Sequence, residues 1–258
     1  MDVKQIRPSE RDRQVLDRLV TTRKIVERQQ PKDYRNCVVM KPWGYEYLIF
    51  ENEHVAVWFL KIYERHATSM HCHPLKKTAL VLLAGKALCN TLQNRNYLNS
   101  LSGLIIEKSV FHSTKALSPG GIELIEIETP PNKTDLVRLD DTYGRECHGY
   151  EGFSEMETEG LRRFDHFYFE ELFHQGQTHV AEKFSLSLES YGDPEHFRNL
   201  QIMDDEILSP CRGRFLTGHG EVVADVGEAH FGRDLKMIPG LTIQGKTTLL
   251  RARAKNIT

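Results

Sequence analysis

Three histidines are spaced so that they could bind one metal ion. His71 and His73 are two positions apart in a β-rich stretch, and side chains at i and i+2 of a strand point to the same face. Cys72 between them then points to the opposite face. His112 stands at the end of a later β-rich stretch, after Gly103 has supplied a turn, and offers a third imidazole from a facing strand. The pattern predicts a site for one divalent cation, Zn²⁺, Fe²⁺, Mn²⁺ or Ni²⁺.

The stretches that must position these histidines are short, rich in β-branched residues and separated by turn residues. Those between residues 36 and 130 are closely spaced, which favours a sandwich or a closed barrel. A helical pattern precedes them at residues 9–29 and ends before Pro31, and we expect this helix to pack outside the barrel. The core of the barrel is predicted to contain Val81, Leu83, Ile105 and Ile125.

The order of these motifs resembles a known family. The HxH pair, the later Gly85, a further turn and a lone histidine form the two-part motif of the cupin superfamily, whose members are double-stranded β-helix jelly rolls. Three segments resemble the cupin domain of type II mannose-6-phosphate isomerases: KPWGYEYL at 41–48, the strand ending in LAGKA, and IELIEIETPPNKTDLVRLDDTYGR at 122–145. The resemblance covers residues 40–146 and implies a mainly β fold.

The predicted organisation has four parts. Residues 1–35 form an N-terminal helical segment, 36–146 the metal-binding cupin barrel, 147–180 a partly helical connector, and 181–258 a second β unit. Strand-like stretches with Gly and Pro at their turns recur in that last part, but no HxH pair does. We therefore predict a bicupin whose second half is degenerate and binds no metal.

One position departs from the cupin motif. Cupins carry a glutamate a few residues after HxH, and Thr78 stands at that position here. A neutral hydroxyl is a poor substitute for a carboxylate ligand. The site is then either a three-histidine site supplemented by water or another carboxylate, or a site that has lost its metal.

Six further polar residues are candidates for the chemistry of this site. Glutamates could act as general bases, and lysines at the barrel mouth, where the family carries a basic residue, would suit a sugar phosphate or a nucleotide sugar. Polar positions that alternate with apolar ones are, however, usually the outer face of a sheet. The predicted catalytic residues are Glu46, Glu126 and Lys61, and the predicted substrate-binding residues are Tyr45, Lys76 and Lys77.

The resemblance implies an enzyme of carbohydrate biosynthesis, isomerase-like or epimerase-like, in which the metal acts as a Lewis acid. The departure at Thr78 leaves two alternatives open. Three imidazoles around Fe(II) with open positions suit a cupin dioxygenase, and a barrel that has kept its shape without its chemistry would be a non-catalytic sugar-binding protein. The isomerase-like enzyme is favoured over the dioxygenase.

Composition limits the partners and the cellular location that we expect for this protein. The 34 basic and 36 acidic residues give a formal net charge of −2, so we expect no electropositive surface for nucleic acid. No apolar run approaches the ~20 residues that cross a bilayer, and the first residues contain no hydrophobic signal core, so we expect a cytoplasmic protein without a membrane partner. Five cysteines without a CxxC pair encode neither a disulfide framework nor a thiolate zinc site.

Cupins commonly pair through their sheets, so the resemblance implies a homodimer. It also implies that the partner of the site is a small-molecule substrate.

Overall fold

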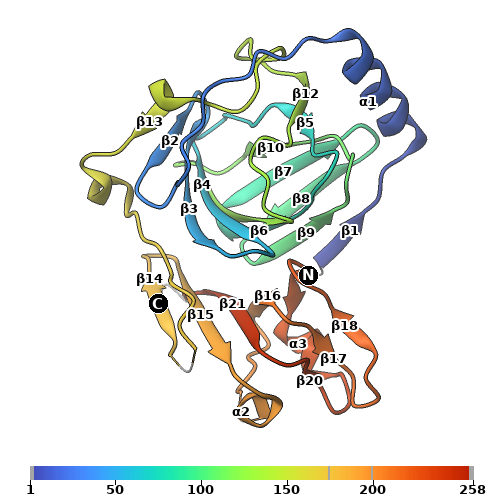
Figure 1. The fold of residues 1–258 in the computed structure, drawn as a ribbon, viewed down its shortest axis with the longest axis vertical. Coiled ribbons are helices and arrows are strands. Elements are labelled where there is room, and N and C mark those ends of the chain that lie inside the picture. Colours follow the sequence, from blue (N-terminus) through green and yellow to red (C-terminus); the bar gives the residue numbers. More distant parts are fainter. Residues whose placement is uncertain (1–2, 174, 199, 256–258) are drawn as a thin grey trace.

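The structure, a computed structural model, describes residues 3–173, 175–198 and 200–255. The ends of the predicted N-terminal segment and of the predicted second unit therefore lie outside the described residues. Within this part of the chain, most elements are strands, arranged in four sheets (Figure 1). The predicted mainly β fold class is confirmed.

Sheets I and II face each other and form the N-terminal barrel. Sheet I has the order β1 (Val3–Ile6), β9 (Ser102–Ile106), β6 (Lys77–Ala84), β11 (Ile122–Thr129), β4 (Ala56–Ile62), β3 (Gly44–Glu51), β2 (Val38–Lys41) and β13 (Met156–Glu157). Sheet II has the order β12 (Val137–Asp140), β5 (Met70–Cys72), β10 (His112–Ala116), β7 (Lys86–Thr91) and β8 (Arg95–Asn99). From β4 to β12 the chain crosses repeatedly between the two sheets, which makes the barrel the expected double-stranded β-helix.

Sheets III and IV form a second unit that repeats this arrangement. Sheet III has the order β14 (Gln177–Val180), β15 (Phe184–Tyr191), β21 (Thr247–Ala254), β16 (Glu206–Arg212) and β19 (His230–Phe231). Sheet IV has the order β18 (Val222–Ala224), β17 (Phe215–Leu216) and β20 (Thr242–Ile243). The neighbours β19-β16-β21-β15-β14 match β9-β6-β11-β4-β3, and β20-β17-β18 match β10-β7-β8.

One strand of the barrel has no counterpart in the second unit. Among residues 175–198 and 200–255, β14 to β21 correspond in order to β3, β4 and β6 to β11, and nothing corresponds to β5. The short helix α2 (Pro194–Arg198) occupies that part of the chain instead. Because the HxH pair belongs to β5 and the residue after it, the second unit lacks the element that would present two imidazoles. The predicted bicupin with a degenerate second half is confirmed.

Sheet I is buried on both faces because sheet III packs against its outer face. Along β6, Leu80 and Leu82 point into the barrel, while Val81 and Leu83 belong to an apolar layer shared with sheet III. The side chains that sheet III adds to this shared layer include Phe184, Leu186, Leu188, Ile207 and Leu250. All four residues predicted for the barrel core lie in the shared layer, so that prediction was wrong by one position along each strand. A strand that is apolar on both faces does not show which face is the inner one.

The N-terminal helix α1 (Glu10–Thr22) packs outside the barrel and is shorter than predicted. Ser9 and Asp12 form a capping box at its start, and the chain becomes extended at Arg23. Leu19 packs against Cys72 and Phe111 on the outer face of sheet II. The segment predicted as helical also contains β1, which pairs in parallel with β9.

In its described residues, 147–173 and 175–180, the predicted connector contains only short turns of helix. These are 3₁₀ turns at Phe153–Glu155 and Leu161–Phe164. The last residues of the connector form β14, which pairs with β15 of the second unit. A further short helix, α3 (Gly232–Lys236), follows β19. None of the helices in the described ranges is long and apolar enough to cross a membrane.

Candidate metal centre

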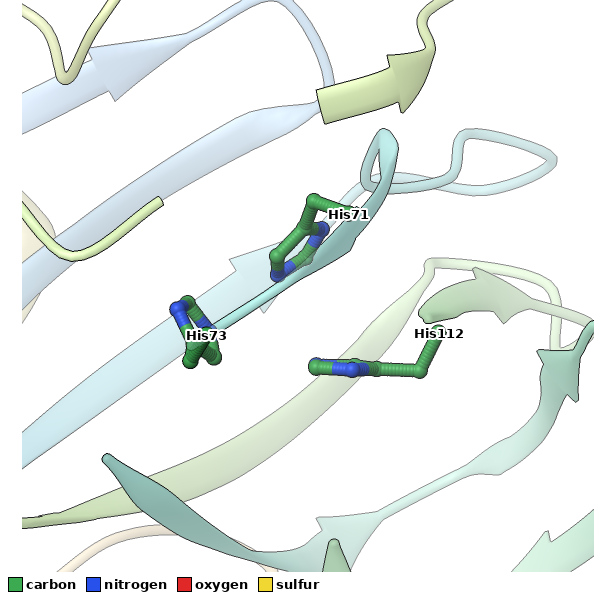
Figure 2. A group of neighbouring side chains, drawn as sticks. All are labelled: His71, His73 and His112. Carbon is green, nitrogen blue, oxygen red and sulfur yellow. The ribbon is translucent and has the colours of Figure 1, made fainter. Parts of the chain in front are cut away.

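The three predicted histidines converge inside the barrel. His71 lies on β5, His73 directly follows that strand, and His112 begins β10 opposite His71 in the antiparallel ladder. Figure 2 shows the three rings turned toward one another. The ring centroids of His71 and His112 are 4.5 Å apart, and one nitrogen of each ring lies within 4.8 Å of the other two. Nitrogens bound about 2.1 Å from one ion are at most ~4.2 Å apart, so the site needs little adjustment to hold an ion.

Each ring is oriented through its Nδ1 atom. Nδ1 lies 2.8 Å from the carbonyl oxygen of Ser69 for His71, 2.6 Å from that of Asp135 for His73, and 3.0 Å from that of Val110 for His112. A carbonyl only accepts, so Nδ1 carries the hydrogen and Nε2 keeps a free lone pair. Bonds of this kind orient metal-binding histidines. The buried Nε2 of His73 has no hydrogen-bond partner, and a metal ion would satisfy it.

The surroundings keep the three imidazoles neutral. Burial lowers the pKa of each ring, and that of His71 lies well below its ordinary value because His112 and His73 are also close. For His73, the ammonium of Lys76 lowers the pKa further. Protons therefore do not compete for the lone pairs at neutral pH. Three neutral imidazoles fit a divalent cation such as Zn²⁺, Fe²⁺, Mn²⁺ or Ni²⁺.

A carboxylate stands beside the triad although position 78 supplies none. Glu126 on β11 points into the barrel, and its Oε1 lies 3.6 Å from Nε2 of His73. Since His73 is neutral, this contact is not an ion pair, and Glu126 forms no ion pair with a lysine or arginine of the described residues. On the neighbouring strand β6, Thr78 stands opposite Glu128, and its buried Oγ1 has no partner. Position 78, which the cupin motif uses for a carboxylate, therefore supplies none, whereas Glu126 and Glu128 of β11 line the interior.

A small cavity with a charged wall adjoins the triad. It measures about 50 Å³, which is room for a few water molecules or for one end of a small ligand. The ionised side chains of its wall are Lys41, Lys76, Lys133, Arg138, Arg145, Glu46, Glu126 and Glu128. Behind the triad, the side chains beside His71 and His112 are mostly apolar, namely Leu60, Ile62, Leu80 and Leu124, with Thr68, Thr114 and Glu126 as the polar ones.

Glu46, predicted as a catalytic base, lines the cavity but is committed to ion pairs. Its Oε1 lies 3.3 Å from Nζ of Lys41 and 3.0 Å from Nζ of Lys133, and the hydroxyl of Tyr150 donates to the same oxygen. Burial alone would raise the pKa of this carboxyl, but the two ammonium groups lower it well below its ordinary value. A carboxylate stabilised in this way is a poor proton acceptor.

Lys76, predicted to bind substrate, also reaches the cavity wall and is also paired. Its ammonium lies 2.7 Å from Oε1 of Glu128 and donates to the carbonyl of Asn132 at 3.0 Å. Lys133 approaches the same carboxylate oxygen at 3.3 Å and lies over the ring of Trp58. The charge of Lys76 is therefore already balanced by protein groups.

Tyr45, Lys61 and Lys77 lie on the other face of sheet I, away from the triad. Lys61 pairs with Glu123 at 2.8 Å, and Lys77 pairs with Glu228 of the second unit at 2.8 Å. Tyr45 packs at the edge of the layer shared with sheet III. Side chains alternate between the two faces along each strand. Tyr45 on β3, Lys61 on β4 and Lys77 on β6 occupy the outward-facing positions. The structure does not bring them to the cavity.

Several residues of the wall were not singled out by the sequence. They are Glu128, Lys133, Arg138, Arg145 and Tyr150. The alternation in IELIEIE places Glu126 and Glu128 on one face of the strand, but from the sequence alone solvated charges at a sheet edge are the slightly favoured interpretation. The others follow β11 in loops and on β12, where no periodicity indicates a direction.

The similarities of this chain to solved structures are of low sequence identity and low TM-score. No protein-family model and no curated protein matches the chain. KdgF from Halomonas sp. is 13% identical over 36% of this chain and 84% of its own, with a TM-score of 0.34. An RmlC-like cupin from Shewanella frigidimarina NCIMB 400 is 14% identical over 37% of this chain and 85% of its own, with a TM-score of 0.34.

The capsular polysaccharide assembling protein CapF from Staphylococcus aureus is 16% identical over 40% of this chain, with a TM-score of 0.37. This chain covers only 34% of CapF. Likenesses of this size carry no argument about function. The assignment to the cupin fold rests on the strand order of sheets I and II.

Proposed function

We propose that this protein is a metal-dependent cupin enzyme that isomerises or epimerises a phosphorylated or nucleotide-activated sugar. The observation that carries the proposal is the meeting of three neutral imidazoles with one carboxylate, Glu126, at one small cavity. A Lewis acid beside a carboxylate is the combination that proton transfer next to a carbonyl requires. The resemblance of residues 40–146 to type II mannose-6-phosphate isomerases agrees with this chemistry.

The residues divide into three roles in this proposal. His71, His73 and His112 hold a divalent ion through Nε2, and the ion supplies Lewis acidity toward a carbonyl or hydroxyl oxygen. Glu126 takes or gives a proton at Oε1, because it is not committed to a cation as Glu46 is. The apolar side chains behind the triad exclude water, which strengthens the electrostatic interactions in the site.

The test combines metal loading with turnover. The protein is stripped with a chelator, reloaded separately with Zn²⁺, Mn²⁺, Ni²⁺ or Fe²⁺, and incubated in D₂O with mannose 6-phosphate, with other sugar phosphates and with nucleotide sugars. NMR follows isomerisation and the exchange of carbon-bound hydrogen. We expect turnover of at least one substrate, and only in the loaded protein.

A pair of variants on β11 separates the proposed base from the strand that carries it. Glu126→Gln should lower the rate by about 10²–10⁴-fold while the protein still binds metal. Glu123→Gln, on the outer face of the same strand, should change neither quantity. A loaded protein that turns over nothing in the panel would count against the proposal.

A second candidate is a three-histidine dioxygenase. It is favoured because Thr78 supplies no carboxylate. The three imidazoles are then the one close group of possible metal ligands found among the described residues. Oxygen uptake by the Fe²⁺-loaded protein would support it. A protein that retains none of the four metals would instead support a sugar-binding role without catalysis.

A further inference from the structure

Besides His73, two buried side chains that line the cavity beside the triad each have a polar atom without a partner among the described residues. Arg138 is 3% exposed and Glu128 is 1% exposed, and both belong to the cavity wall. Nε of Arg138 and Oε2 of Glu128 have no hydrogen-bond partner. The first atom can only donate and the second, on an ionised carboxylate, can only accept. A buried polar group left unpaired is destabilising, so the two atoms indicate a ligand that supplies both an acceptor and a donor.

The two terminal nitrogens of the Arg138 guanidinium are paired with protein groups, which leaves Nε as the unpaired donor. Its NH1 donates to the carbonyls of His148 and Gly149 at 2.6 and 2.8 Å, and its NH2 lies 3.3 Å from Glu151. On β12, Arg138 is the residue paired with His71 of β5. Paired residues of neighbouring strands extend their side chains on the same face, so the guanidinium stands next to the triad.

The neighbouring cations are more fully occupied by acids. Arg145 forms ion pairs with Asp141 at 2.7 Å and with Glu151 at 2.5 Å. Lys41 lies between Glu151 and Glu46. Arg138 is therefore the cation of the wall whose free donor a ligand can use.

On the other side, Glu128 has one oxygen in use and one left over. Its Oε1 faces the ammonium groups of Lys76 and Lys133, while Oε2 is unpaired. Thr78, opposite it in the ladder, does not line the cavity. The unpaired Oε2 can accept a hydrogen bond from a hydroxyl of a ligand.

We infer that the cavity selects a hydroxylated anion, whose anionic oxygen accepts from Nε of Arg138 and one of whose hydroxyls donates to Oε2 of Glu128. The inference deepens the proposed function, because it concerns the substrate of the same site. A carboxylate and a phosphate both supply the anionic oxygen. Sugar acids and sugar phosphates are therefore the two sources, and the small cavity takes up one end of either.

Calorimetric titration with four probes tests this selection: D-gluconate, D-glucose 6-phosphate, inorganic phosphate and uncharged D-glucitol. Gluconate, glucose 6-phosphate or both should bind, and glucitol should bind at least tenfold more weakly. Binding of one organic anion without the other identifies the source. Glu128→Gln should weaken that organic anion several-fold and affect inorganic phosphate less, because phosphate has no carbon-bound hydroxyl to place on Oε2.

Arg138→Lys is the deciding variant because it keeps the charge and removes the Nε donor. It should weaken the binding of the organic anion at least tenfold. The matched control is Arg251→Lys in the second unit, where another buried arginine is paired with Glu206 at 2.8 Å, and it should bind like the wild type. Undiminished binding in a folded Arg138→Lys protein overturns the inference. So does equal binding of glucitol and the anions by the wild type, a comparison that needs no variant.

The same titrations on metal-free protein and on His73→Ala separate this inference from the proposed function. Anion binding that depends on Arg138, in a protein that never retains metal, leaves the inference standing and removes the metal enzyme. If the protein binds metal and turns over a substrate but does not select anions, the proposed function stands and the inference is wrong.

Discussion

Removal of one imidazole of the triad should abolish the stabilisation that a bound ion gives. In His73→Ala two imidazoles remain, too few to hold a divalent ion against water. A ligand present at 100 times its dissociation constant stabilises the folded state by about 2.7 kcal/mol. In a chain of this length 1 kcal/mol shifts Tm by about 2–4 °C. Metal should therefore raise the Tm of the wild type by about 5–11 °C and that of His73→Ala by less than about 2 °C.

Scanning calorimetry with and without added Zn²⁺, Mn²⁺ or Ni²⁺ measures this difference, and elemental analysis of the same samples gives the bound metal. His54→Ala is the control, since His54 is 43% exposed and lies beside Glu53 rather than in the cavity. It should behave like the wild type. Equal metal content and equal shifts in Tm for wild type and His73→Ala would mean that the three histidines are not a metal site.

Three other substitutions, with Phe153→Ala as a control, test the packing and the ion pairs of the fold. Asp12→Ala removes the capping box and a 3.0 Å bond to the backbone amide of Phe111, and should lower the free energy of unfolding by about 1–3 kcal/mol in urea titrations; an unchanged midpoint would refute the role given to this carboxylate. Phe184→Ala opens the shared layer and should cost about 3–5 kcal/mol, whereas Phe153→Ala, at a side chain 53% exposed, should stay within about 0.5 kcal/mol. Burial would raise the pKa of Glu228, but the nearby imidazole of His230 and the hydrogen bonds from the Lys77 ammonium and the Asp225 backbone amide lower it to about 2. The stability that this carboxylate contributes is then complete above pH 4.5 and is lost as the pH falls toward 2, so the difference in unfolding free energy between wild type and Glu228→Gln should shrink by about 1 kcal/mol between pH 7 and pH 4. A difference that stays constant would show that the carboxylate is not stabilised by these bonds.

The triad could be predicted because it depends on a local rule. Two residues at i and i+2 share a face in any strand, and the position of His112 followed from the order of the motifs. The same rule put Glu126 and Glu128 on one face, but it could not say whether that face was the inside of the barrel. That depends on the neighbours of β11 in sheet I, which come from distant parts of the chain.

The errors have the same physical origin. Val81 and Leu83 were assigned to the barrel core because they are apolar, yet they face sheet III, whose strands begin about a hundred residues later in the chain. Lys133, Arg138 and Tyr150 reach the cavity from loops and an edge strand. Their direction is set by tertiary contacts, on which no local periodicity reports.

The layer between sheets I and III also constrains how this protein can be recombined. An ordinary cupin barrel grafted in place of residues 36–146 would bring its own outer face, and sheet III would lose the apolar surface that it was selected to cover. The second unit cannot be moved to another barrel for the same reason. A change on one side of the layer must be matched by a change on the other side. The two units can therefore be exchanged between homologues only together, even though the triad belongs entirely to the first unit.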